Sequence, residues 1–457
     1  MKSINPATGQ LIREYEPYSL KEVDDRITTA HETFLAWSEL RVDERTQNLL
    51  GVADVLEDHK QAFARLMSSE MGKPLKESLG EVQKCAWLIR ELHEYAPSWL
   101  DDKPIQGADG QKNYVRYEPL GPVYIIMPWN FPFWQVFKVA IPPIVAGNTI
   151  LLKHASNVAG CALAIHDVFK KAGLDGVLQT VLVSHETSDS IIAHEKIAAV
   201  SLTGSEKAGA HVASLAARHI KKSVLELGGS DAFIVCADAD SEAAAHGAVL
   251  GRFLNAGQVC IGAKRLLVHA SIVDEFTKAF VRATKEKKVG DPLHEETDMG
   301  PLVNESAVRD MQEFVDDART RHADVVLGGL VLTGRVIIFE PTILRNVTQD
   351  MRVMREETFG PIAPVMAFAN EEEAIAVANN SDFGLNASVW TQDLRRGERM
   401  ARQLRAGGVF INRPSASHPL IPLGGIKKSG YGRELGEIGI REFTNPKPIN
   451  VYTVGEP

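Results

Sequence analysis

The chain is poor in cysteine and has none of the spacings that usually bring cysteines together. Its 457 residues include four cysteines, Cys85, Cys161, Cys236 and Cys260, and no two of them form a CxxC pair. The histidines form no HExxH motif. A disulfide framework and a metal cluster are therefore not expected, and no metal is predicted.

The sequence also lacks a block of basic residues and a long apolar run. Its formal net charge is −9, whereas a nucleic-acid-binding surface needs clustered Lys and Arg. The segment MKSINPATGQLIREYEP has no signal-peptide core, and no run of about 18 apolar residues follows it. We expect a cytoplasmic protein that binds neither nucleic acid nor membrane and whose substrate is a small molecule.

Helical periodicity dominates the first hundred residues. In SLKEVDDRITTAHETFLAWSEL, apolar residues recur at helical spacing, and Ser19 followed by Glu22 forms a capping box. A second helical pattern follows Asp43 and stops near MGKP, and a third runs through EVQKCAWLIRELHEYA. The segment 101–119 loses this period and carries a Gly/Asp turn, which predicts a hairpin.

The central part of the chain alternates short apolar runs with stretches of helical length. The runs are PVYIIMPW, NTILLK, LQTVLV, AAVSLTG, KSVLELGG and DAFIVC. They are typical of buried parallel strands, so the alternation predicts a doubly wound α/β sheet. The same alternation after Cys260, in RLLVHA, IAPVMAF, ASVW and GGVFIN, predicts a second α/β unit. No internal repeat or low-complexity linker is present.

Two residues in this α/β region are candidates for chemistry. Cys260 lies in NAGQVCIGAKR, where a glycine and an amide neighbour leave room for a substrate and a thiol can be activated as thiolate. The alternative, an inert buried cysteine, is the commoner fate of a cytosolic thiol. Glu226 ends the run KSVLE, at the carboxyl edge of a sheet where α/β proteins bind ligands. A solvated carboxylate at a strand end is the alternative.

Other positions fit a structural role as well as a ligand site. Gly204 and Ser205 follow a strand at the expected start of a helix, where phosphate binds well, but a plain strand-to-helix turn looks the same. Asn130, inside the apolar run MPWNFPFW, either serves a site or caps a turn. Lys153 ends another strand, as edge charges often do. The segment GGIKKSGYGRE lacks P-loop spacing, which argues against ATP.

Seven motifs, taken together and in order, carry a resemblance that no single residue does. MPWNFP, LLKHAS, LTGSEKAG, LELGGSD, NAGQVC, REETFGP and LGGIKKSGYGREL resemble the aldehyde dehydrogenase superfamily over essentially the full chain. Within it, LLKHASN, VLELGGSD and GRFLNAGQVCIGAKR are most similar to the short bacterial succinate-semialdehyde dehydrogenases.

The resemblance implies an α/β fold with three parts. A doubly wound, Rossmann-type cofactor domain would comprise residues 1–100 and 120–227, and an α/β catalytic domain residues 228–439. A small β oligomerisation element would pair the hairpin 101–119 with residues 440–457, which include FTNPKPINVYT. Because an exposed hairpin has unpaired edges, this element would join a second copy of the chain. We expect a homodimer or a homotetramer.

The resemblance also implies covalent catalysis. Cys260 would attack the aldehyde carbon to give a thiohemiacetal, whose hydride passes to the nicotinamide, and water would cleave the resulting thioester. The Asn130 side-chain amide and the Cys260 backbone N–H would hold the oxyanion, and Glu226 would activate the water. Such a base favours release of the free acid over acyl transfer to CoA. The contrasting hypothesis, a catalytically idle structural subunit of this fold, is disfavoured because all three residues are retained.

For the cofactor, the resemblance implies that NADP is preferred and NAD is also used. Many NAD-preferring relatives carry Glu at position 156, where it accepts hydrogen bonds from both ribose hydroxyls and repels a 2′-phosphate; Ser156 beside Lys153 leaves room and a cation for that phosphate. The implied cofactor residues are Lys153 and Ser156 at the adenine ribose, Gly204 and Ser205 at the pyrophosphate, Glu357 and Phe359 at the nicotinamide ribose, together with Met127, Pro128, Trp129 and Leu227.

The resemblance implies succinic semialdehyde as the substrate, with a broad-range aliphatic or aromatic aldehyde dehydrogenase as the alternative. Lys138 falls where succinate-semialdehyde dehydrogenases commonly have an arginine, and Ser417 where they have a carboxylate-binding serine. Leu254 departs from the longer enzymes, which often have a second arginine there. Because lysine lacks the planar fork of arginine, we expect looser selectivity. The alternative for Lys138 is a surface charge on its helix.

Overall fold

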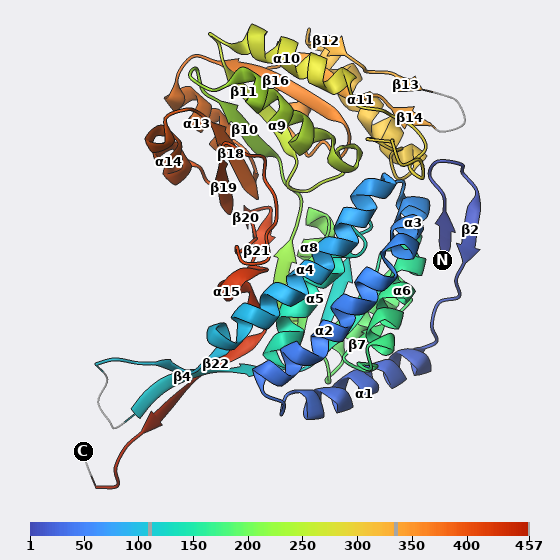
Figure 1. Ribbon diagram of the computed structural model, residues 1–457, viewed down its shortest axis with the longest axis vertical. Helices are drawn as coiled ribbons and strands as arrows, with labels where there is room; N and C mark the ends of the chain where they lie inside the picture. Colours follow the sequence, from blue (N-terminus) through green and yellow to red (C-terminus); the bar gives the residue numbers. More distant parts are fainter. Residues whose placement is uncertain (108–111, 333–336, 456–457) are drawn as a thin grey trace.

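Two large, mainly parallel sheets organise the computed structural model, which describes residues 1–107, 112–332 and 337–455 (Figure 1). The first contains, in spatial order, β21 (Gly430–Tyr431), β9 (Lys222–Glu226), β8 (Ala199–Thr203), β5 (Val123–Met127), β6 (Ile150–His154) and β7 (Leu178–Thr180). The second contains β12 (Asp324–Leu327), β15 (Thr342–Arg345), β16 (Ile362–Phe368), β11 (Ala263–His269), β10 (Asp231–Val235), β18 (Asn386–Trp390) and β19 (Gly408–Ile411). Every apolar run that predicted a strand overlaps one of these strands.

Helices cover both faces of the first sheet, which is why its strands are apolar on both sides. On β5, Val123 and Ile125 pack into one core and Tyr124 into another. The helices of this half are α1 (Leu20–Trp37), α2 (Val42–Asp58), α3 (Lys60–Met71), α4 (Leu75–Leu100), α5 (Trp134–Ala146), α6 (Ala159–Lys171), α7 (His185–Ala193) and α8 (Glu206–Arg218). The predicted doubly wound arrangement is confirmed.

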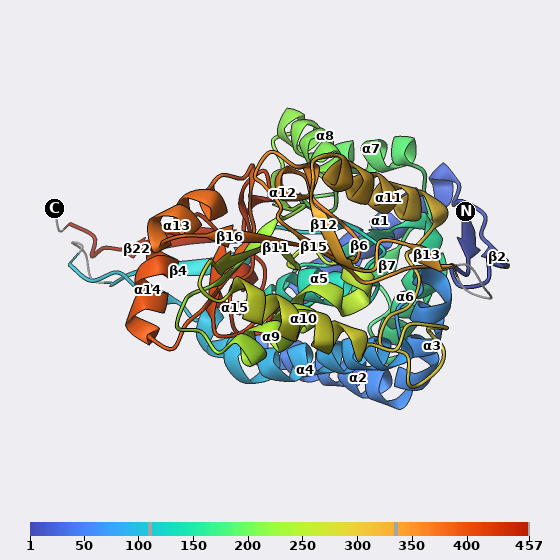
Figure 2. The same ribbon diagram turned by 90° about the horizontal axis from the view of Figure 1, so that it is seen from above.

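The second sheet forms the other half of the molecule (Figures 1 and 2). Its helices are α9 (Ser241–Phe253), α10 (Val273–Lys285), α11 (Glu305–Thr320), α12 (Arg352–Arg355), α13 (Glu371–Asn379) and α14 (Leu394–Gln403). The chain returns to the first half near its end: α15 (Gly436–Ile440) follows β21, and Leu423, Leu435 and Ile440 belong to the first half's core. The predicted domain limits stay a prediction.

Local signals place the helix ends well, with two differences. The capping box at Ser19 and Glu22 is present, and Gly72 ends α3 in the left-handed conformation. The second predicted helix is in fact two, because the backbone leaves helical geometry at His59. The third is longer than EVQKCAWLIRELHEYA, since α4 begins directly after Pro74 and continues through Pro97. A hairpin of β1 (Lys2–Ile4) and β2 (Leu11–Glu14), not predicted, precedes α1.

A small sheet projects from the body of the molecule (Figure 1). It consists of β22 (Thr444–Val451), β4 (Lys112–Pro119) and β3 (Lys103–Pro104). β22 pairs with β4 antiparallel along its whole length, from Thr444 opposite Pro119 to Val451 opposite Lys112. The predicted pairing of the 101–119 segment with the C-terminal segment is confirmed, although part of the predicted turn lies outside the described residues. Its joining of a second copy stays a prediction.

Short elements complete the chain. They are the 3₁₀ helices η1 (Ser156–Val158) and η2 (Leu254–Gly257) and the strand pairs β13 (Val331–Leu332) with β14 (Ile338–Phe339) and β17 (Phe383–Gly384) with β20 (Ile426–Lys427). Within the described ranges, no helix has the length and apolar character needed to cross a membrane. No cluster of three or more His, Cys, Asp or Glu side chains among these residues is arranged to hold a metal ion.

Candidate active site

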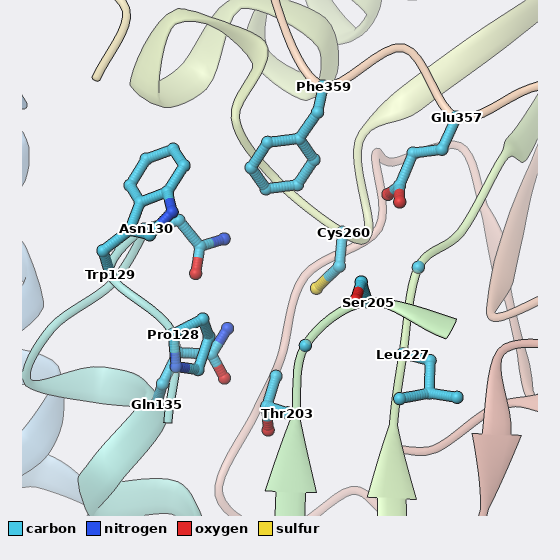
Figure 3. A pocket seen from close by; sticks show the side chains of 12 residues that line it. Pro128, Trp129, Asn130, Gln135, Thr203, Ser205, Leu227, Cys260, Glu357 and Phe359 are labelled. Atoms are coloured by element: carbon cyan, nitrogen blue, oxygen red, sulfur yellow. The ribbon is translucent and has the colours of Figure 1, made fainter. Parts of the chain in front are cut away.

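A pocket of about 240 Å³ lies where the carboxyl ends of β5, β8 and β9 meet the loop after α9 (Figure 3). Its lining includes nine residues predicted from sequence: Pro128, Trp129, Asn130, Gly204, Ser205, Leu227, Cys260, Glu357 and Phe359. Motifs that are more than two hundred residues apart in the chain therefore form one site. The strand order explains this, because the ends of parallel strands meet at one edge of a sheet.

Sequence reasoning missed three lining residues, Gln135, Thr203 and Gly228. Thr203 and Gly228 are direct neighbours of predicted residues, and Gln135 is a polar residue within the apolar start of α5. Oε1 of Gln135 and Oγ1 of Thr203 are buried and have no hydrogen-bond partner among the described residues. Buried polar atoms usually have partners, so these two are suited to a bound ligand or water.

The loop that carries Cys260 has an unusual backbone. Asn255, Ala256 and Gly257 have φ values of 49°, 53° and 75°, so three successive residues are left-handed. A side chain at Gly257 would lie 2.3 Å from the carbonyl oxygen of Gly360, which only glycine avoids. Strained backbone of this kind persists where surrounding contacts hold it, often at functional sites.

Buried and partly buried hydrogen bonds hold this loop in place. Glu77 accepts the backbone N–H of Asn255 (2.9 Å), and the Gln258 side chain accepts that of Val303 (2.9 Å). Arg252 is fully buried and donates to the carbonyl oxygens of Gly257 (3.3 Å) and Thr358 (2.9 Å). Because Thr358 lies between Glu357 and Phe359, Arg252 connects the cysteine loop to the part of the pocket wall that these two residues form.

The Cys260 thiol lies at the pocket wall and is half-buried (Figure 3). Burial raises its pKa to about 11, an effect that nearby Lys138 and Lys264 partly oppose. The thiol is therefore protonated at neutral pH, and a reaction at its sulfur needs a group that removes the proton or an added positive charge nearby. Cys85, Cys161 and Cys236 are all buried.

Glu226 is buried at the end of β9, so the alternative of a solvated carboxylate is wrong. Burial, followed by the nearby Glu434 carboxylate, raises its pKa to about 8, and Lys138 opposes this. Its Oε1 has no hydrogen-bond partner among the described residues. A side chain at Gly424 would come within 3.0 Å of this oxygen, so the glycine leaves space beside it. A carboxyl group with such a pKa can exchange protons near neutral pH.

Asn130 is buried between the two halves of the site. Its Nδ2 donates to the backbone oxygen of Gln258 (3.1 Å), and its own backbone oxygen accepts from Nδ2 of Asn255 (2.8 Å). The Asn130 amide is thereby fixed against the loop that carries Cys260. Its predicted role as an oxyanion donor stays a prediction.

Lys138 is buried on α5, so the alternative of a surface charge is wrong. Its ammonium forms an ion pair with the equally buried Glu434. The positive charge is therefore matched within the protein, next to Glu226 and Cys260. Its predicted role in binding a substrate carboxylate stays a prediction.

Glu357 is held by a lysine that the sequence did not single out. Lys264, fully buried on β11, forms an ion pair with Glu357 and donates to the backbone oxygens of Gly229 (2.7 Å) and Cys260 (3.0 Å). The backbone N–H of Gly229 also donates to Glu357 (3.1 Å). Lys264 thus orients Glu357 and the backbone of the candidate nucleophile together.

Two features that can bind phosphate lie at the start of α8 and at the end of β6. Ser205 caps α8 and accepts the N–H of Ala208 (3.3 Å). The first turn of this helix, whose free N–H groups can bind an anion, therefore begins at the pocket. Lys153, at the end of β6 near the predicted Met127, is buried, and no hydrogen-bond or ion-pair partner for it exists among the described residues. Ser156 opens η1 and is exposed. An unpaired lysine near an exposed serine fits a phosphate group.

Comparisons with known proteins identify the family of the chain. The aldehyde dehydrogenase family matches residues 1–449. The chain belongs to the aldehyde dehydrogenase family. An aldehyde dehydrogenase from Paenarthrobacter nicotinovorans is 44% identical over 451 residues, 98% of each chain. A probable NADP-dependent succinate-semialdehyde dehydrogenase from Synechocystis sp. is 44% identical over 448 residues, also 98% of each.

A solved structure similar to this aldehyde dehydrogenase is succinic semialdehyde dehydrogenase from Streptococcus pyogenes in complex with NADP+. It is 32% identical, with a TM-score of 0.96 and coverage of 99% of this chain and 100% of that chain. The predicted fold class is confirmed.

Proposed function

We propose that this aldehyde dehydrogenase oxidises succinic semialdehyde to succinate, with NADP preferred and NAD also used. The observation that supports the proposal is that Cys260 and Asn130 line one pocket, while Glu226, the chain neighbour of the pocket residue Leu227, is buried close enough for its charge to act on Cys260. Two of the proteins to which the chain is similar, from Synechocystis sp. and S. pyogenes, carry the name of this activity with NADP.

In the proposed reaction, the Cys260 sulfur adds to the aldehyde carbon and forms a thiohemiacetal. The Asn130 Nδ2 group and the Cys260 backbone N–H stabilise the oxygen that becomes negative, and a well-placed donor of this kind contributes about 3 kcal/mol. A thioester would remain once the hydride had left that carbon for the bound cofactor. Glu226 would then take a proton from the water that cleaves the thioester, which releases the acid and the Cys260 thiol. The raised pKa of Glu226 makes it a usable base near pH 8.

The cofactor would be held by residues on both walls. Lys153 and Ser156 would bind the 2′-phosphate, Gly204 and Ser205 the pyrophosphate, and Glu357, oriented by Lys264, the nicotinamide ribose. Met127, Pro128, Trp129, Leu227 and Phe359 would surround the rest of the molecule. When bound, NADP supplies the acceptor for the hydride.

Substitution of Ser156 by Glu should shift cofactor preference toward NAD. A carboxylate near Lys153 would form an ion pair with it and repel the 2′-phosphate, so the NADP-to-NAD ratio of kcat/KM should fall by the equivalent of about 1 to 3 kcal/mol. Steady-state kinetics with both cofactors measures this ratio. Ser156→Ala is the control, because it removes the hydroxyl without adding charge. An unchanged ratio in Ser156→Glu would show that selectivity is set elsewhere.

The proposed substrate predicts a preference for a terminal carboxylate. Among straight-chain aldehydes, succinic semialdehyde should have the highest kcat/KM, glutaric semialdehyde should be accepted, and butanal and pentanal should be poorer. The measurement is a kcat/KM panel for these four aldehydes with NADP and with NAD. An enzyme indifferent to the carboxylate would instead be a broad-range aliphatic or aromatic aldehyde dehydrogenase.

We also infer that the β3–β4–β22 sheet joins two copies of the chain into a homodimer or homotetramer. The projection of this sheet from the body of the molecule supports the inference (Figures 1 and 2).

A further inference from the structure

Lys84, on α4, is a half-buried cation without an anionic partner among the described residues. Its Nζ donates to Oγ of Ser417 (2.7 Å) and lies 4.3 Å from the centre of the Trp134 ring. No carboxylate of the described chain forms an ion pair with it. Because burial is not compensated in this way, the pKa of Lys84 is lowered to about 8. An anion bound next to Lys84 would stabilise the positive charge that burial destabilises.

After the hydrogen bonds within the protein are formed, Lys84 and Ser417 can still donate hydrogen bonds to a ligand but cannot accept any. Oγ of Ser417 accepts from Lys84 and also from Nε1 of Trp134 (3.0 Å), which leaves the Ser417 hydroxyl proton to donate. An ammonium carries three protons, and only one is used by Ser417. A carboxylate, which only accepts hydrogen bonds, matches this set.

The position of Lys84 relative to the pocket is fixed by the helix before it. Glu81, one turn earlier on the same face of α4, accepts the backbone N–H groups of Phe133 (2.8 Å) and Trp134 (2.9 Å). These groups open α5, whose next residue, Gln135, lines the pocket with Cys260. The Glu81 carboxylate therefore holds Lys84 against the start of the helix that leads to the site.

Lys84 lies close to the reacting cysteine by a second route. Lys138 follows Trp134 by one turn on α5, and its charge acts on both Lys84 and Cys260. The two lysines differ in whether a carboxylate of the protein already neutralises their charge. Lys138 is paired with Glu434, whereas no carboxylate in the described part of the chain pairs with Lys84.

We propose that Lys84 and Ser417 bind the distal carboxylate of the aldehyde substrate, so that Lys84 is the cation that selects a carboxylated aldehyde. This inference rests on the proposed function. It also gives a physical reason for the expected looseness of selectivity, because a single ammonium and a hydroxyl grip a carboxylate less rigidly than an arginine fork does.

The test is the ratio of kcat/KM for succinic semialdehyde to kcat/KM for butanal. Lys84→Met keeps the apolar stem and removes the charge, so this ratio should fall between about tenfold and a hundredfold, mainly through KM for the carboxylated aldehyde. Lys84→Arg should retain most of the ratio, and Ser417→Ala should lower it. Lys278→Met, on the exposed face of α10, is the control for loss of one positive charge.

The outcomes separate the inference from the proposed function. A wild-type ratio near one would overturn the substrate itself. If the wild type is selective and Lys84→Met keeps the ratio, only the role of Lys84 is overturned. The same holds if Lys84→Met loses activity with both aldehydes in equal proportion, because Lys84 would then have a structural role. If Lys84→Met does not fold, Ser417→Ala and calorimetric binding of succinate against butyrate decide, since equal affinities for the two acids would also overturn the role.

Discussion

Cys260→Ala should reduce aldehyde oxidation by about a thousandfold or more, because alanine has no sulfur to carry the thiohemiacetal and the thioester. The pocket walls should remain intact, since Cys260 is held by its backbone: the Cys260 carbonyl accepts from Lys264, and Arg252 fixes the preceding loop. Cofactor binding, followed by the fluorescence of the pocket residue Trp129, should therefore persist while formation of reduced nicotinamide stops.

Cys236→Ala is the matched control for this prediction. Cys236 is likewise a free thiol, but it is buried and its sulfur contacts Met400 in the core of the second half, away from the pocket. Its loss should lower thermal stability modestly and leave the rate per folded enzyme near that of the wild type. Near-normal turnover by Cys260→Ala would contradict the covalent scheme as a whole.

Glu226→Gln should separate the two halves of the reaction. Formation of the thioester does not need the proposed base, so a burst of reduced cofactor should appear, whereas steady-state turnover should fall by about a hundredfold to ten-thousandfold. In the wild type the ionised carboxylate is the active form, and its pKa is about 8. The steady-state rate should therefore rise with pH through about 8 and fall on the acid side.

The pH profile of the variant provides the second readout. Glutamine does not ionise, so the rise near pH 8 should be absent from Glu226→Gln. Stopped-flow absorbance measures the burst, and initial rates between pH 6 and pH 10 measure the profile. An unchanged steady state, or a rise at the same pH in the variant, would assign the base to another group.

The strands and most of the pocket could be predicted from sequence because each rests on a local pattern. A nearly all-apolar run such as AAVSLTG is typical of a strand buried on both faces, and Gly204 and Ser205 at its end then mark a sheet edge. The break at His59 could not be predicted, because the helical period continues on both sides of one non-helical residue. The predicted pattern EVQKCAWLIRELHEYA also ends one residue before Pro97, whereas α4 continues through this proline to Leu100.

The pairing of buried charges could not be predicted either. Lys138 and Lys264 are each separated by many residues from the carboxylates with which they pair. A lysine within a helix, such as Lys84, has the same local pattern whether its head group lies in solvent or against an indole ring. The partner that neutralises Lys138 comes from the return of the chain at Glu434. Such contacts follow from topology, which only the folded structure defines.

The late return of the chain also bears on how the protein is synthesised. Lys447 on β22 pairs with Glu118 on β4, 329 residues earlier, and β21 completes the edge of the first sheet beside Glu226. At ribosomal rates of about 5 to 20 residues per second, β4 and β9 wait on the order of tens of seconds for these partners. During that interval the nascent chain exposes two unpaired strand edges, and we expect chaperones to bind it there until its last strands emerge.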